Sequence, residues 1–282
     1  MNKAVAVPGR LAIAGVIARR ELLQSVRGIG GYVALSVALA AATAVLLVDV
    51  RALAIGGLLV LSDPFGPSLA ISLLVVALFL AVSAAVSTAR DREGGTLEVL
   101  FYGPVDEVSY ILGKVGGLLM AFIAALPLIG VVFVLLSLLT GFVLTPKVLA
   151  TLVVSVVPAA MIVSFGTLLA IGTSRVRTAI LLLIAVVAVI LGVSFAYNLV
   201  LMIPISDAAS PVLPLRDSLA ALDRVVDWLS PFSYLERVVD GATRGAWRGA
   251  AVNLAIALTY ALVMMALAVL WMRRRGVQRS GE

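Results

Sequence analysis

The stretch VGGLLMAFIAALPLIGVVFVLLSLLTGFVLTP, residues 115–146, contains no charged side chain. Five further stretches of the chain share this property. The shortest of the six, 28–48, would form a helix roughly 31 Å long at about 1.5 Å per residue, which is enough to cross a hydrocarbon core of about 30 Å. The remaining charge-free stretches are 64–89, 148–174, 178–206 and 249–272.

These stretches predict an all-α integral membrane protein in which residues 1–282 form a single transmembrane domain. A seventh charge-free stretch, 52–62, is too short to span a bilayer. Pro127 and Pro158 are expected to interrupt helical hydrogen bonds within two of the spans. The six transmembrane helices are expected at about 29–48, 67–89, 115–138, 148–172, 178–202 and 250–272.

The composition excludes several classes of protein. The chain is 62% hydrophobic and 13% charged, whereas soluble domains are about 45–50% apolar and about 25% charged. It contains no Cys and no His, which excludes disulfides, thiolate or imidazole metal sites and Ser-His catalysis. We therefore expect neither a metal site nor an enzymatic activity in this chain. The net charge of +6 is explained by the positive-inside rule, so we expect no nucleic-acid partner.

The positions of Lys and Arg orient the predicted helices. The short loops on one side carry only Arg51 and Lys147. Because positive residues gather on the cytoplasmic side, we expect a multi-pass protein of the cytoplasmic membrane with both termini in the cytoplasm. The positive residues of the expected cytoplasmic side are Lys3, Arg10, Arg19, Arg20, Arg27, Arg90, Arg92, Lys114, Arg175, Arg177, Arg273, Arg274, Arg275 and Arg279.

Residues 9–27 precede the first span and show a helical pattern. Arg20, Gln24 and Arg27 fall on one face. The pattern predicts an amphipathic elbow helix that lies on the inner membrane surface and contacts lipid, with a flanking basic anchor as the alternative. The expected apolar face consists of Leu11, Gly15, Ala18, Leu22 and Val26, and the expected elbow residues are Arg19, Arg20, Glu21 and Arg27.

The segment 207–248 is the one sizeable connection expected on the outer side. Ser230 can cap a helix and Pro231 suits its first turn, which predicts two outer helices joined at this pair. Such a helical hairpin can serve as a lid or gate, or it can be a passive re-entrant hairpin. The apolar face of the first helix is expected at Leu215, Leu219, Leu222, Val226 and Leu229, and the gate at Ser230, Pro231, Glu236 and Gly241.

The most polar stretch, RDREGGTLEVLFYGPVDEVSYILGK, covers residues 90–114. Gly94 and Gly95 should end one helix, and Thr96 can cap a short new one that ends at Gly103 and Pro104. Leu97, Leu100 and Phe101 would give this short helix an apolar face. The residues leave two interpretations open, which are docking into a groove of a soluble protein and a solvated loop.

This stretch resembles the loop after the second span in permease subunits of ABC transporters of the ABC-2 (type V) class. That family shows an E-R-E-x-G-T-L-E run followed by a proline and G-K, and this chain has 91–98, Pro104 and Gly113-Lys114. The run 19–22 resembles the R-E-L motif of the family's elbow. The segment 229–241 resembles an S-P-x-x-x-x-E-x-x-x-G motif, which favours the subgroup of nitrous-oxide-reductase maturation and gliding-motility permeases.

The resemblance implies a six-span permease, functioning as an exporter, that pairs with a second copy or a paralogue. It also implies a separate ABC ATPase (nucleotide-binding) subunit that binds ATP and Mg²⁺, with movement transmitted through the elbow and a coupling loop at 90–113. The family usually has Ser or Thr and then Arg after the proline, whereas Val105-Asp106-Glu107 stands here and suggests a more basic groove on the partner. The implied coupling residues are Arg90, Asp91, Arg92, Glu93, Thr96, Leu97, Glu98, Leu100, Pro104, Arg175 and Arg177.

The chain has no phosphate-binding loop of its own. A Walker A loop needs G-x-x-x-x-G-K-[ST]. Gly113-Lys114 is the one candidate, but Val108 replaces the first Gly and Val115 follows the Lys. We therefore expect this chain to bind no cofactor.

Three other functions remain open. An ion-coupled secondary transporter usually carries ionisable groups within its spans, and no such group interrupts the charge-free stretches. An ABC importer permease would show E-A-A-x-x-x-G, which Glu107 and Gly113 only partly match. A membrane scaffold would not transport at all. The substrate is not encoded in any motif, although the apolar walls suit a lipid-like cargo, and Gly166 and Ala170 could form helix contacts in a dimer.

Overall fold

The computed structural model describes residues 9–56, 64–103, 105–203 and 212–275. In this part of the chain every regular element is a helix, as predicted, and no strand occurs. The helices are α1 (Arg10–Arg27), α2 (Ile29–Gly56), α3 (Gly66–Glu93), α4 (Thr96–Tyr102), α5 (Glu107–Thr140), α6 (Pro146–Val154), α7 (Val156–Ile171), α8 (Val176–Leu201), α9 (Val212–Leu229), α10 (Pro231–Thr243) and α11 (Trp247–Arg275).

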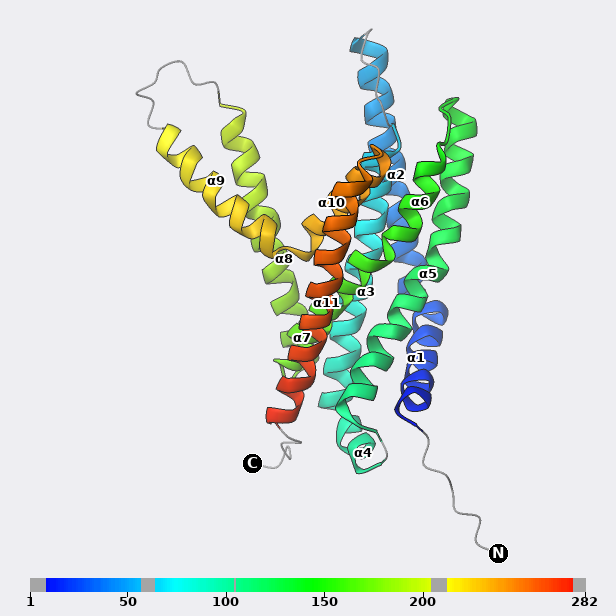
Figure 1. Cartoon of the computed structure of the whole chain (residues 1–282), viewed down its shortest axis with the longest axis vertical. Helices are drawn as coiled ribbons and strands as arrows, with labels where there is room; N and C mark the ends of the chain where they lie inside the picture. Colours follow the sequence, from blue (N-terminus) through cyan, green and yellow to red (C-terminus); the bar gives the residue numbers. More distant parts are fainter. Residues whose placement is uncertain (1–8, 57–63, 104, 204–211, 276–282) are drawn as a thin grey trace, which may run out of the picture.

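Six helical segments among the described residues are long and apolar enough to span a membrane, which indicates a multi-pass membrane protein. The start of α1, the end of α11 and the short helix α4 lie at one end of the bundle (Figure 1). The turns after α5 and after α10 lie at the other end. The spanning segments are Ile29–Arg51, Gly66–Glu93, Glu107–Thr140, Pro146–Ile171, Val176–Leu201 and Trp247–Arg274.

The two prolines expected to interrupt spans differ in their effect. Pro158 follows a break at Ser155, which divides the fourth span into α6 and α7. Pro127 lies inside α5, and that helix continues through it. Its missing N–H removes one backbone hydrogen bond there without ending the helix. Because Pro158 lies in the first turn of α7, its missing N–H helps to keep the two helices separate.

Helix α1 packs lengthwise on the beginning of α5. It is separated from α2 by Gly28, which has an extended conformation. Ile13, Ala14 and Glu21 are its buried residues, whereas Leu11 of the expected apolar face is 82% exposed. Two glycines of α5 receive the side of α1 that carries these buried residues, and most of the expected apolar face is left exposed or half-buried.

Those glycines allow the two backbones to come very close. A Cβ atom on Gly113 would lie 2.7 Å from Ile17 Cβ, and one on Gly117 would lie 2.5 Å from the Ala18 carbonyl oxygen. The spacing Gly-x-x-x-Gly places both on one face, as in close helix pairs of membrane proteins. In the same way Gly166 of α7 lies against Ala81 of α3, so its close helix contact is formed within the chain and not with a second copy.

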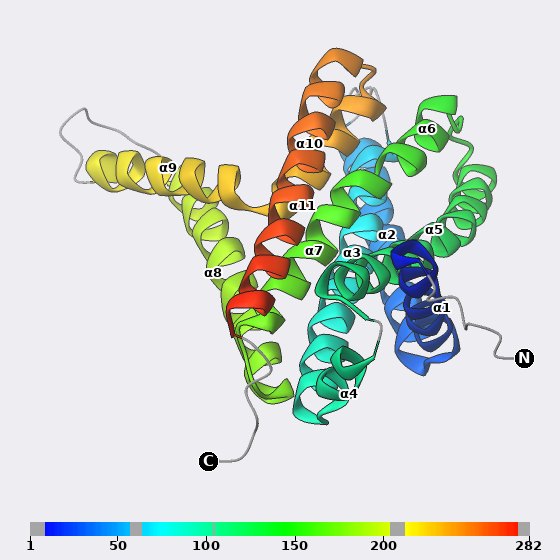
Figure 2. The same cartoon turned by 60° about the horizontal axis from the view of Figure 1, so that its bottom comes forward.

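Helices α9 and α10 meet at Ser230. The Ser230 hydroxyl accepts hydrogen bonds from the amides of Phe232 and Ser233, and Pro231 occupies the first turn of α10. Helix α9 lies beside α8, where the Ser194 hydroxyl donates to Asp223 Oδ1 at 2.8 Å (Figures 1 and 2). Helix α10 is buried among α3, α6, α7 and α11. Residues 207–211 of the predicted segment lie outside the described residues.

The tight packing of α1 on α5 predicts that Gly117→Ala lowers the stability of the protein. The added methyl group meets backbone atoms of α1, and such overpacking costs about 1–3 kcal/mol. Gly116→Ala is the matched control, since nothing lies within 4 Å of its Cβ position. Thermal unfolding in mild detergent should show a lower melting temperature for Gly117→Ala alone, and equal melting temperatures would contradict this packing.

Candidate functional site

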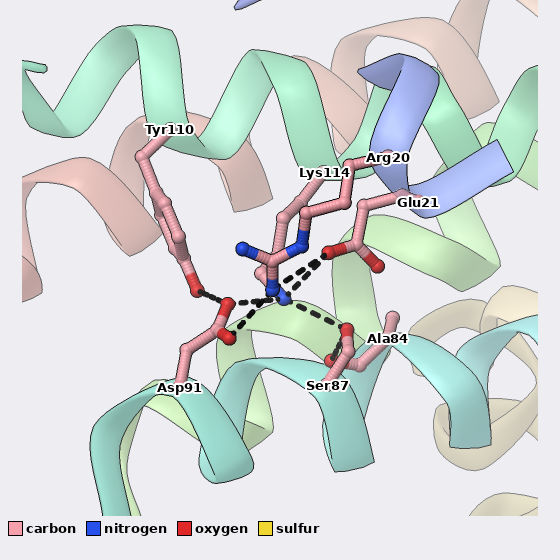
Figure 3. A network of polar contacts seen from close by, with 7 residues as sticks. All are labelled: Arg20, Glu21, Ala84, Ser87, Asp91, Tyr110 and Lys114. Carbon is pink, nitrogen blue, oxygen red and sulfur yellow. Dashed lines mark hydrogen bonds and ion pairs between the residues drawn. The ribbon is translucent and has the colours of Figure 1, made fainter. Parts of the chain in front are cut away.

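A cluster of charged and polar side chains connects α1, α3 and α5 near the end of the bundle that carries α4 (Figure 3). We call it the charge cluster. Three of its ionised side chains are almost completely removed from solvent: the exposed fraction is 0% for Lys114, 2% for Glu21 and 7% for Asp91. The charge cluster consists of Arg20, Glu21, Ser87, Asp91, Tyr110 and Lys114.

Lys114 is at the centre of the cluster. Its Nζ lies 2.8 Å from Asp91 Oδ2 and 3.1 Å from Glu21 Oε1, and it donates to the Ser87 hydroxyl at 2.9 Å. An ammonium group has three donors, and these three contacts satisfy them. The buried charge is therefore fully paired, and its contacts offset the desolvation penalty of several kcal/mol that an isolated charge would carry.

Asp91 accepts from three donors on two other helices. Its Oδ1 accepts from the Arg20 guanidinium at 2.9 Å, and its Oδ2 accepts from the Tyr110 hydroxyl at 2.9 Å as well as from Lys114. Partial burial alone would lower the pKa of Arg20, but the Asp91 and Glu21 carboxylates outweigh it and raise that pKa above its ordinary value. Two cations and two anions make the cluster neutral as a whole.

Helical spacing explains how the sequence builds this cluster. Ser87 and Asp91 are four residues apart on α3, and Tyr110 and Lys114 are four apart on α5, so each pair shares one helix face. Gly117 lets α1 approach until Glu21 reaches Lys114. The cluster and the close packing of α1 on α5 therefore depend on each other.

The two residues after Asp91 bind a different part of the chain. The Arg92 guanidinium donates to the carbonyls of Ile171 at 2.7 Å and Thr173 at 3.3 Å, at the C-terminal end of α7. Glu93 Oε2 accepts from the amide of Val176 at 2.9 Å, at the N-terminal end of α8. Each charge has the sign that a helix end favours. We call Asp91, Arg92 and Glu93 the α3 clasp.

The α3 clasp revises our interpretation of the polar stretch. Docking on a soluble protein was one of two expected uses of these charges, yet all three have partners within the chain. Much of the expected loop 90–113 is helical, since it contains the last turn of α3, all of α4 and the first turns of α5. Pro104 lies outside the described residues.

Helix α4 begins at Thr96, but Thr96 does not cap it as predicted. The N-cap position is Gly95 in the left-handed conformation at φ 68°, and no side chain caps the helix. Glu98 lies in the first turn, Leu97 is buried, and Leu100 and Phe101 pack against the core. The Phe101 ring also contacts the Tyr110 ring edge-on, with centroids 6.2 Å apart. Helix α4 is thus in direct contact with the charge cluster.

The opposite face of α4 carries two large exposed side chains. Val99 is 72% exposed and Tyr102 is 83% exposed, and they lie three residues apart on the helix. Unlike the charges of the α3 clasp, neither is used to hold the chain together. This face is therefore available to a partner.

The acidic pair after the proline also has partners within the chain. Asp106 caps α5 by accepting from the Ser109 amide at 3.1 Å, and Arg10 Nε lies 3.1 Å from Asp106 Oδ2. Hydrogen bonds from Ser109, with the nearby Arg10, lower the pKa of Asp106 below its ordinary value. Glu107 Oε2 lies 3.6 Å from Arg273 Nε of α11. These contacts account for both acids without a basic groove on a partner.

The remaining predicted site residues lie outside the charge cluster. Five of them are Arg residues of the expected elbow and coupling sets, and their side chains are exposed. Of the expected gate residues, Ser230 and Pro231 begin α10, Glu236 is exposed, and Gly241 packs closely on Ala250 of α11. The exposed Arg residues are Arg19, Arg27, Arg90, Arg175 and Arg177.

The sequence prediction did not include Lys114, Tyr110 and Ser87 among the site residues. Lys114 carried one signal, because it is the charged residue that directly precedes the apolar stretch 115–146, four residues after Tyr110. Ser87 carried none, since a neutral hydroxyl in an apolar helix is common. Within the described ranges, no group of three or more His, Cys, Asp or Glu could hold a metal ion.

Comparison with known proteins identifies no relative. No protein-family model matches this chain, and no curated protein matches it. Its function has therefore to be inferred from its own residues and their geometry.

The pairing in the cluster predicts that Lys114→Met is strongly destabilising. It would leave the Glu21 and Asp91 carboxylates buried with one cation between them, and breaking a buried pair costs about 3–5 kcal/mol. Adding Glu21→Gln restores the balance of charge, so the double variant should melt at a higher temperature than Lys114→Met alone. If Glu21→Gln lowers the melting temperature of the Lys114→Met variant as much as it lowers that of the unmodified protein, the two residues are not coupled.

Proposed function

We propose that this chain is the membrane-spanning permease subunit of an ATP-binding-cassette transporter of the ABC-2 type, working as an exporter. In this proposal a separate ATPase subunit binds and hydrolyses ATP with Mg²⁺, and two permease copies, or this chain and a paralogue, form the pathway. The observation that carries the proposal is α4, a short helix with an exposed apolar face at one end and direct contact with a buried charge cluster behind it.

The exposed face of α4 suits docking on a soluble subunit. Val99 and Tyr102 can fill a groove as apolar anchors, and a few such anchors supply most of the free energy of binding in protein interfaces. Glu98 on the same short helix adds a charge at the edge. The polar motif that resembles the ABC-2 coupling loop contains this helix.

The route of movement follows from the contacts behind α4. A displacement of α4 would act on Tyr110 through Phe101, and from Tyr110 on Asp91 and Lys114. The charge cluster would transmit this displacement to α1, and Arg92 and Glu93 would transmit it to α7 and α8. A closing ATPase would thus move the ends of several spans as one body, and ATP binding would bias a two-state change.

The position of the chain in the membrane is part of the same proposal. Both termini lie in the cytoplasm, α1 is the elbow at the inner surface, and its exposed Leu11, Val26, Arg19 and Arg27 contact lipid. The α9–α10 pair, with Ser230, Pro231, Glu236 and Gly241, forms the gate on the outer side. Residues 230–241 read S-P-x-x-x-x-E-x-x-x-x-G, one residue longer between Glu and Gly than the motif of the maturation and gliding-motility permeases that they resemble.

One observation favours a second candidate, an ion-coupled secondary transporter. The charge cluster places ionisable side chains of α3 and α5 within segments long enough to span, which the charge-free stretches had not suggested. Such groups mark coupling-ion sites in many transporters. The full pairing of Lys114 favours a structural role, and transport driven by an ion gradient without any ATPase would distinguish this candidate.

The proposal predicts that an ABC ATPase co-purifies with the tagged chain from its native membrane in mild detergent. Val99→Glu combined with Tyr102→Ala should reduce its recovery and its ATP hydrolysis severalfold, because the anchors of α4 are lost. Val143→Glu is the control, at an equally exposed residue in the turn after α5 at the opposite end. A chain that purifies well folded and alone, or an α4 variant that retains its ATPase, would contradict the proposal.

A further inference from the structure

Four Arg side chains lie around the start of α8, at the end of the bundle that carries α4. Two of them, Arg175 and Arg177, flank Val176, the first residue of α8. All four side chains are exposed, and among the described residues none of them has an ion-pair or side-chain hydrogen-bond partner. We call them the arginine patch, which consists of Arg90, Arg175, Arg177 and Arg274.

Contacts between helices bring the members of the patch together. Ala89, at the end of α3, packs in one buried cluster with Ala179 of α8. A Cβ atom on Gly172, just after α7, would lie 3.6 Å from Cη2 of Trp271 on α11. Trp271 is one turn before the patch residue of α11, so the end of α11 lies beside the turn between α7 and α8 (Figures 1 and 2).

Positive charge exceeds negative charge in this region. The nearby Glu93 carboxylate accepts from the amide of Val176 at 2.9 Å. Glu107 Oε2 lies 3.6 Å from Nε of Arg273, which precedes the patch residue of α11. Both acids therefore have partners outside the arginine patch. Even with Glu93 counted, the four guanidinium groups leave a net positive charge that an external anion can balance.

The patch lies at the level expected for lipid headgroups. Helices α8 and α11 have 26 and 29 residues, which is roughly 39 and 43 Å at about 1.5 Å per residue and exceeds a hydrocarbon core of about 30 Å. Their ends therefore extend into the headgroup layer. Trp271 is 41% exposed and lies one turn further into the bundle, at the position where Trp side chains meet the membrane interface. Below it α8 exposes Leu181 and Ile184.

An anionic phospholipid matches this arrangement of charges and apolar surface. A guanidinium group can donate two hydrogen bonds to one phosphate, and clustered Arg residues beside a span attract anionic headgroups. A soluble acidic protein would match the charges but not the apolar surface directly below them. We propose that the arginine patch binds the headgroup of an anionic phospholipid whose acyl chains lie along the exposed side of α8. The family resemblance implied ATPase coupling for Arg90, Arg175 and Arg177, and this proposal gives them a different partner.

The test measures quenching of Trp271 fluorescence by brominated lipids. The chain has three Trp residues, so Trp228→Phe with Trp247→Phe leaves Trp271 as the one fluorophore of this kind. The purified full chain is placed in vesicles of equal parts phosphatidylcholine and phosphatidylglycerol, with bromine on the acyl chains of either lipid. Because the composition is constant, the two quenching values compare the lipids that contact Trp271. Brominated phosphatidylglycerol should quench severalfold more strongly.

Substitutions in the same background show whether the patch causes this preference. Arg175→Gln with Arg177→Gln should lower it severalfold, whereas Arg175→Lys with Arg177→Lys should retain most of it because the charge is kept. Arg19→Gln with Arg27→Gln is the matched control, since it removes two exposed Arg residues of α1 on the other side of the bundle (Figure 2). High salt should weaken the preference by screening. Melting temperatures verify that each variant is folded.

Equal quenching by the two brominated lipids would overturn the proposal. A preference lowered equally by the α1 control would also overturn it, because the effect would then come from the overall charge. If Arg175→Gln with Arg177→Gln keeps the lipid preference but loses a co-purifying ATPase, the patch contacts that subunit and the proposal is wrong. The fluorescence measurement needs no ATPase, so its result is independent of the proposed function.

Discussion

The structure depends on one electrostatic constraint, which is that Lys114 is charged and has no access to water. Such a charge has to be paired, because its desolvation is not otherwise compensated. Asp91 of α3 and Glu21 of α1 supply the pairing. Arg20 and Tyr110 donate hydrogen bonds to the carboxylate oxygens of Asp91. The position of α1 is therefore fixed from two sides, by the ion pairs and by the glycines of α5 that let it approach. Loss of the ion pairs would therefore weaken the close packing of α1 on α5, and a larger residue at either glycine would disturb the ion pairs.

The end of α3 extends this constraint to the rest of the bundle. Asp91, Arg92 and Glu93 follow one another, and on a helix successive side chains point in different directions. Each therefore contacts a different element: Asp91 binds α1 and α5, Arg92 binds the end of α7, and Glu93 binds the start of α8. The cytoplasmic end that we propose is thus joined at one helix terminus. This arrangement suits a protein whose spans respond together to a force applied at α4.

The general fold could be predicted from sequence because a bilayer imposes strong requirements. Charge-free stretches long enough to span have few alternatives to a helix, since lipid cannot satisfy backbone polar groups. The Ser230-Pro231 start of α10 was also predictable from local capping chemistry. The charge cluster was not, because a Lys at the boundary of an apolar stretch has the same sequence appearance whether it is buried or solvated. The partners of Arg92 and Glu93 are about 80 residues away, and no local pattern shows them. Thr96 was expected to cap α4, but Gly95 takes that position because the chain needs a positive φ there.

The most direct test of this account is hydrogen–deuterium exchange on the chain in lipid nanodiscs, comparing Asp91→Asn with Arg92→Ala. Two separate effects are expected. Asp91→Asn should increase amide exchange in α1 and the first turns of α5, and leave residues 171–178 unchanged. Arg92→Ala should increase exchange in 171–178 and leave α1 unchanged. If both variants loosen the same segments, or if neither changes exchange in these regions, the end of α3 does not hold the helices together as described.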